Sequence, residues 1–121
     1  MSYQFKLDVE KTIVEVEFKG IVDFSERKKA INEGVLVLQD REYPRILVNL
    51  VDAQMQLSKV EKADLVNYVS TQPALFEAKT AFLIHNEQTE QNAIDNAIVR
   101  PDDFDAHVFY SRTQAIEWLS N

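Results

Sequence analysis

The sequence predicts an α/β protein with a mixed, mainly parallel five-stranded sheet and four helices. Two patterns predict this class. Two strand-like segments are followed by alternating helical and strand-like segments, which gives the order β-β-α-β-α-β-α-β-α. The nearly continuous apolar run from Lys79 to Ile84 is typical of an interior parallel strand covered on both faces. At 121 residues the chain suits one domain, 1–121, with a single core.

The chain opens with two strands and a helix. Apolar and polar side chains alternate over residues 3–7 and 14–18, so we expect a hairpin with the first strand at an edge. Gly20 is expected to form the turn that follows. Asp23 and Glu26 have capping-box spacing and begin a helix that should end near residue 40, with its apolar residues on one side: Phe24, Ile31, Val35 and Leu38.

Gly34 lies inside this helix. A glycine there costs about 1 kcal/mol relative to alanine. The helix should therefore either pack very closely at this point or bend.

The stretch from Arg45 to Tyr68 contains the first candidate site. Its apolar start, residues 46–48, predicts a buried strand, and Ser58 with Glu61 predicts a capped helix. Residues 52–57 follow neither a strand nor a helix period, so we expect a loop. Such a loop leaves the carboxyl end of a strand, where ligands and partners usually bind in open α/β sheets.

Two further helices and two strands complete the expected order. Pro73 ends the second helix, and the strand 79–84 follows. A third helix is expected over residues 90–98 before Pro101, then a short strand over 106–110. Ser111 with Gln114 caps a terminal helix, in which Trp118 should cover the edge of the core.

Charge and composition narrow the classes of partner. Thirteen basic and twenty acidic residues give a net charge of -7, which disfavours nucleic acid and strong attachment to anionic lipid, while apolar contact with a membrane stays open. With no Cys there is no disulfide framework or thiolate nucleophile. The opening MSYQFKLDVE lacks the pattern of a signal peptide, and the apolar runs are too short to cross a bilayer. We therefore expect a cytoplasmic protein, with peripheral membrane association left open.

The residues expected for catalysis or cofactor binding are sparse. Two glycines cannot form a Gly-rich phosphate loop, and His85 and His107 are expected at different ends of their strands. No carboxylate motif organises a metal site. We expect no cofactor and no metal. An enzyme that uses His85 with a carboxylate is the least favoured class, because no nucleophile accompanies it.

Seven residues remain as candidates for binding a ligand or partner, each with a structural alternative. Asp52 could simply be solvated, His85 hydrogen-bonded, and Ser58 a plain helix cap. Apolar residues in loops usually contact the core, but they can also line a pocket or an interface. The candidates are Asp52, Met55, Leu57, Ser58, Leu75, Phe76 and His85.

The chain resembles the STAS-like, or SpoIIAA-like, domains, which are related to the anti-sigma-factor antagonists. The resemblance spans the whole length. It rests on the opening strand pair, on RILVNLVDA before a capped helix, on KTAFLIH, and on the ending HVFYSRTQAIEWL. In the antagonists, the helix after the third strand opens with an Asp-Ser-Ser-Gly type motif whose serine is phosphorylated. Ser58 falls at that serine, whereas the Asp, the second Ser and the Gly are absent here.

The resemblance therefore implies the SpoIIAA-like branch, small and often dimeric proteins linked to apolar ligands or membranes. We expect a non-enzymatic binding module for a small apolar ligand, including lipid, or for a protein partner, and we expect a homodimer. The alternative is a regulator of the antagonist type that is switched by phosphorylation at Ser58, where a phosphate would be stabilised by the free amides of the helix N-terminus.

Overall fold

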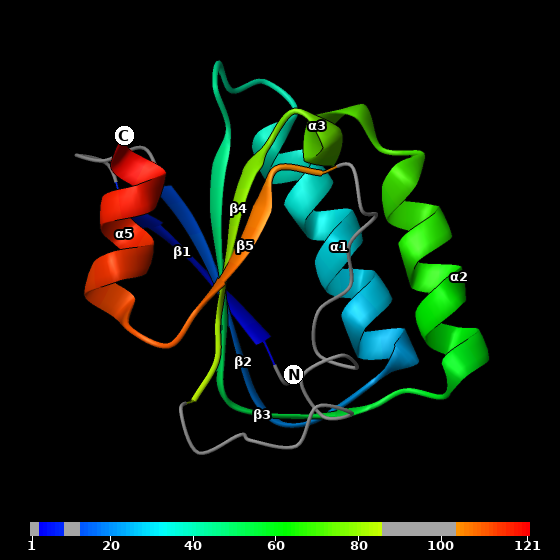
Figure 1. The fold of residues 1–121 in the computed structure, drawn as a ribbon. Helices are drawn as coiled ribbons and strands as arrows, with labels where there is room; N and C mark the ends of the chain where they lie inside the picture. Colours follow the sequence, from blue (N-terminus) through cyan, green and yellow to red (C-terminus); the bar gives the residue numbers. More distant parts are fainter. Residues whose placement is uncertain (1–2, 9–12, 86–103) are drawn as a thin grey trace.

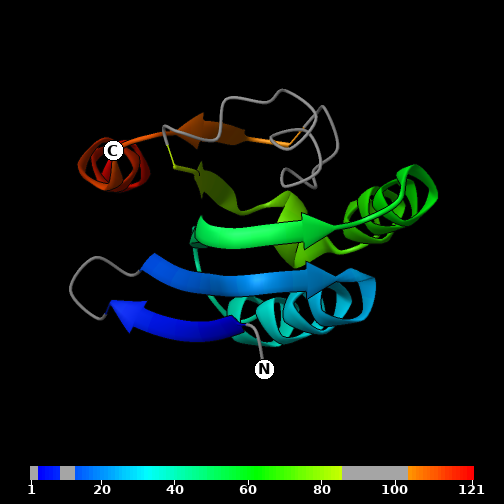
Figure 2. The same cartoon turned by 90° about the horizontal axis from the view of Figure 1, so that it is seen from below.

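The computed structural model describes residues 3–8, 13–85 and 104–121. They form a five-stranded sheet with the order β1-β2-β3-β4-β5 (Figures 1 and 2). β1 is antiparallel to β2, and the other neighbouring pairs are parallel. The predicted hairpin, edge strand and mainly parallel sheet are confirmed. The strands are β1 (Tyr3–Asp8), β2 (Ile13–Asp23), β3 (Arg45–Gln56), β4 (Lys79–Leu83) and β5 (Ala106–Phe109).

Helices cover both faces of the sheet. α1 (Phe24–Leu38), α2 (Lys59–Ser70) and the short α3 (Pro73–Phe76) lie on one face, and α5 (Arg112–Ser120) lies on the other (Figure 1). The helix expected over residues 90–98 lies outside the described residues. Pro73, expected only to end α2, also begins α3, because its fixed φ suits the first turn of a helix.

The three predicted helix caps are confirmed. The Asp23 carboxylate accepts a hydrogen bond from the Glu26 amide at 2.9 Å. Ser58 and Glu61 form a reciprocal capping box. The Ser111 hydroxyl accepts from the amide three residues later.

Two expectations about β2 and β3 are wrong, for a shared reason. Gly20 does not end β2; it lies within the strand at φ +71°, just after a bulge between Glu17 and Lys19. Beyond the bulge, residues 19–23 pair with residues 52–56, so the expected loop is the second half of β3. The polar residues of this half point outward and alternate with half-buried ones, a strand period that Ala53 makes hard to recognise.

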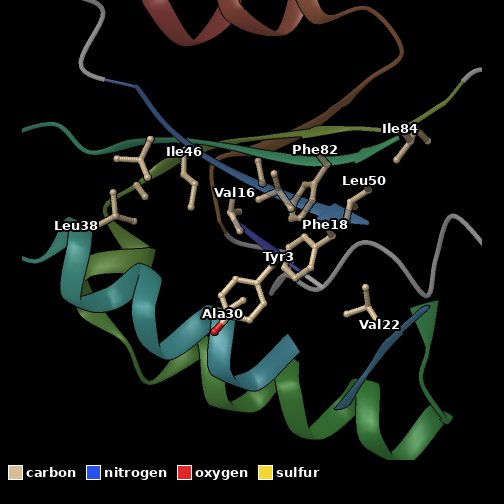
Figure 3. Close-up of a cluster of buried hydrophobic side chains, with 14 residues drawn as sticks. Tyr3, Val16, Phe18, Val22, Ala30, Leu38, Ile46, Leu50, Phe82 and Ile84 are labelled. Carbon is tan, nitrogen blue, oxygen red and sulfur yellow. The ribbon is translucent and has the colours of Figure 1, made fainter. Parts of the chain in front are cut away.

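Alternation along the strands divides the core into two layers. On the side of α1, large side chains from β1 to β4 pack against Ala30 and Leu38 (Figure 3). On the other side, Leu47 and Leu83 pack against Ala115 and Leu119 of α5. The layer beneath α1 and α2 contains the cavity described next.

Candidate functional site

The seven candidate residues do not converge on one edge of the sheet. Asp52 and Ser58 lie toward the carboxyl end of β3, and His85 follows the carboxyl end of β4. Leu75 and Phe76 lie in α3, immediately before β4, at the opposite end of the parallel strands (Figure 1). The separation arises because α2 runs back along the sheet for 12 residues, a rise of about 18 Å.

The apolar candidates have different environments. Leu57 is buried at 8% exposure and packs with Leu65, whereas Phe76 is 54% exposed and contacts the ring of Phe104 edge-on. Met55 and Leu75 are half-buried and pack against the core. The four therefore neither line one pocket together nor all lie in the central core.

A cavity of about 70 Å³ lies between the sheet and helices α1, α2 and α3. Leu75 is the only one of the seven candidates among its lining residues. The other described lining residues come mainly from the five strands, α1 and α2 and are almost entirely apolar; they include Phe5, Phe18, Ala30, Gly34, Val48 and Phe82. Because the cavity lies under the helices rather than at a loop, loop-based reasoning could not locate it.

Among the described residues that line the cavity, Arg27 is the one with a charged side chain. It projects from the first turn of α1 and is only 4% exposed. Its Nη1 donates to the sulfur of Met55 at 3.3 Å, and its guanidinium carbon lies 5.1 Å from the centroid of the Phe18 ring. None of the ion pairs among the described residues includes Arg27. Among the described residues, this buried cation thus has only a thioether and an aromatic ring as partners.

This placement of Arg27 is energetically costly. Burial lowers the pKa of the guanidinium to about 10, so the group stays charged at neutral pH. A lowering of this size destabilises the charged form by on the order of 3 kcal/mol. A cation in the first turn also opposes the helix dipole. Residues that reduce stability without a compensating contact are found preferentially at functional sites.

A sequence signal for Arg27 exists, although the helix pattern used above does not include it. The buried residues of α1 are Arg27, Ala30, Gly34 and Leu38, with the three- and four-residue spacing of an inward-facing stripe. The expected inner side was centred instead on Phe24, Ile31 and Val35, which are only half-buried. An arginine that precedes small residues at this spacing, here Ala30 and Gly34, would have indicated a buried cation on the inner side of the helix.

The close packing expected at Gly34 is not found. A Cβ built on it would lie 3.8 Å from the Phe5 ring, which is an ordinary van der Waals distance. The glycine instead leaves space on the cavity wall.

Ser58 is exposed and engaged in its cap. Its hydroxyl accepts from the Glu61 amide at 3.1 Å, and its own amide donates to the Glu61 carboxylate at 2.9 Å. A phosphate at this position would lie beside that carboxylate, which opposes the stabilisation by the helix N-terminus.

A second buried polar group, on the face covered by α5, is fully paired. The Glu15 carboxylate accepts from both Arg112 amino groups and from Asn49 Nδ2 at 3.1 Å. The Arg112 hydrogen bonds hold the pKa of Glu15 below its usual range, against the opposing effect of burial. This network joins α5 to β2 and β3 and has the character of a structural contact.

Two other features are absent from the described residues. Within residues 3–8, 13–85 and 104–121, no helix combines the length and apolar character needed to cross a membrane. The same residues contain no group of three or more His, Asp or Glu side chains placed to hold a metal ion.

The order of elements and the sheet topology are those of a SpoIIAA-like α/β fold. The structure is similar to the crystal structure of an uncharacterized protein of the DUF3478 family, with a SpoIIAA-like fold, from Shewanella loihica PV-4. The TM-score is 0.63 at 14% sequence identity, and the match covers 97% of this chain and 91% of that chain. No protein-family model and no curated protein matches the sequence. The resemblance stated from the sequence is thus confirmed for the fold.

Proposed function

We propose that the protein is a non-enzymatic binding module that holds a small apolar ligand between its sheet and helices α1 to α3. The cavity is the observation that carries the proposal. The described residues of its walls are almost wholly apolar, so a hydrocarbon group placed against them would be removed from water.

The size of the cavity favours a small ligand. An engineered cavity of about 150 Å³ in another protein takes up benzene. At about 70 Å³, this cavity is about half that size, which favours a ligand with a short hydrocarbon chain. A full lipid chain would need the helices to move apart, so lipid binding and membrane association have less support than binding of a small molecule.

Titration with pentan-1-ol, followed by amide chemical shifts, tests the proposal. We expect the largest shifts at residues on the cavity wall, such as Ala30, Gly34 and Val48. Ala30→Leu should fill the cavity and abolish these shifts. Lys29→Leu, at the preceding position of α1, which is exposed, should preserve them. If Ala30→Leu overpacks the core, Gly34→Ala offers a milder filling variant. Alcohol shifts that are absent, or equal in the two leucine variants, would refute the proposal.

Native mass spectrometry of freshly purified protein provides a complementary test. It would reveal a co-purified small molecule and the number of subunits, and therefore also tests the proposed homodimer. A ligand-free monomer would count against both.

The alternative, a regulator switched at Ser58, has weaker support, because Glu61 already occupies the helix N-terminus. Exposure of the protein to kinases of its source organism, followed by intact-mass analysis, would test it. Absence of a phosphate adduct would count against this alternative.

A further inference from the structure

The cavity wall also indicates the charge of the ligand, an inference that rests on the proposed function because it concerns the same cavity. The cavity wall contains one buried cation, Arg27, at 4% exposure. Its polar contacts among the described residues are limited to the Met55 sulfur, a weak acceptor. A guanidinium has five N–H donors, so most of its hydrogen-bonding capacity is unused by the described residues.

We propose that Arg27 binds the carboxylate of a small monocarboxylic acid whose apolar part fills the cavity. The planar guanidinium matches a carboxylate through two parallel hydrogen bonds. Its desolvation has already occurred in the free protein, so the ligand meets a preorganised donor group.

The charge balance of the site selects a monoanion. Among the described residues lining the cavity, Thr80 is the only polar residue besides Arg27, and it is uncharged. One carboxylate and one guanidinium form a neutral pair, whereas a phosphate dianion would leave an uncompensated negative charge in an apolar site. A neutral alcohol would bind the same apolar walls but leave the guanidinium without an anion.

The position of Arg27 agrees with the usual location of ligands in open α/β sheets. It follows β2 by four residues and contacts Met55 in the last part of β3, so it lies near the carboxyl ends of these two strands. The Arg27–Met55 contact therefore joins the cavity wall, to which Arg27 belongs, to the candidate binding edge at the end of β3, to which Met55 belongs. The carboxylate group would lie at this end of the cavity, with the hydrocarbon part directed toward Gly34 and Leu75 on its wall.

Calorimetric titration with three probes of equal chain length tests the inference: pentanoate, pentan-1-ol and pentyl phosphate at neutral pH. We expect the wild-type protein to bind pentanoate most tightly. Arg27→Met should weaken pentanoate binding at least about 30-fold, the usual effect of removing one partner of a buried charge pair, while pentan-1-ol binding persists. Arg27→Lys, which keeps the charge but not the planar donor pair, should give intermediate affinity for pentanoate.

Lys29→Met is the matched control, since it removes one positive charge from an exposed position of the same helix. It should leave pentanoate binding unchanged. Three outcomes would each overturn the assignment of Arg27: an equal loss of pentanoate binding in Lys29→Met and Arg27→Met, equal binding of pentanoate and pentan-1-ol by the wild type, or a preference for pentyl phosphate.

If none of the three probes binds, the proposed function fails as well. If only the alcohol binds, the cavity module stands and the carboxylate inference fails. Circular dichroism of each variant checks that it is folded.

Discussion

Replacement of Arg27 by methionine should stabilise the ligand-free protein, which is an unusual outcome for a buried residue of α1. The cost of burying the charge is on the order of 3 kcal/mol, from the lowered pKa of the guanidinium. The substitution also removes the interaction with the Phe18 ring, worth about 1 kcal/mol, and a weak hydrogen bond to Met55. Methionine fills similar volume with a flexible apolar chain. We therefore expect a net gain of about 1–2 kcal/mol in the free energy of unfolding.

Urea unfolding of ligand-free protein, followed by circular dichroism, measures this gain, and thermal unfolding should show a rise of roughly 4–8 °C. Lys29→Met should change stability by less than about 0.5 kcal/mol, as is usual for an exposed site. The gain should shrink as pH rises above about 10, because folded wild-type protein then loses the Arg27 proton before the unfolded chain does. A loss of more than about 1 kcal/mol in Arg27→Met at neutral pH would refute the reasoning and indicate that Arg27 is a structural residue.

Three further predictions concern the rest of the fold. Arg112→Met should lower stability by about 1–3 kcal/mol at pH 7, since the buried Glu15 carboxylate then keeps the neutral Asn49 side chain as its hydrogen-bond partner. Because the pKa of Glu15 is lowered in the folded wild type, this stability is present above the unfolded pKa of the carboxyl group and is lost as pH falls. The stabilities of the two proteins should therefore converge when urea unfolding is repeated at acid pH. Replacement by alanine should have opposite effects at the two glycines. Gly20→Ala should destabilise the protein by about 1–2 kcal/mol because of its positive φ, and Gly34→Ala should stabilise it by up to about 1 kcal/mol. Thermal melts that show the same sign for both variants would contradict this account. Ser58→Ala should lower stability by about 1 kcal/mol through loss of the cap, and Ser58→Asn, which can also cap, should restore most of it in the same melts.

Local chemistry was sufficient to predict most of the fold. Alternating side chains in residues 3–7 and the apolar run 79–84 each indicate a strand whatever its neighbours, and both strands form where expected. The caps at Asp23 and Ser58 are contacts over three residues, so they too can be read directly from the chain. These features depend on period and on short-range hydrogen bonds.

The second half of β3 could not be predicted in this way. Residues 52–56 form a strand only because residues 19–23 lie alongside them, and those residues do so only after the bulge that precedes Gly20. Both conditions involve backbone pairs about thirty residues apart in the chain. A weakly apolar segment is extended here by its neighbour, not by its own propensity.

The sequence by itself determined the α/β class, the hairpin, the helix caps and the resemblance to SpoIIAA-like domains. It also placed the candidate binding edge at the end of β3, where Met55 contacts Arg27. Only the tertiary structure decided that Leu75 and Phe76 lie at the other end of the sheet, because α2 carries the chain back across it. Only the tertiary structure, likewise, showed that Arg27 is a buried cation on a cavity wall, since burial and the absence of an ion pair among the described residues depend on side chains contributed by several strands and helices.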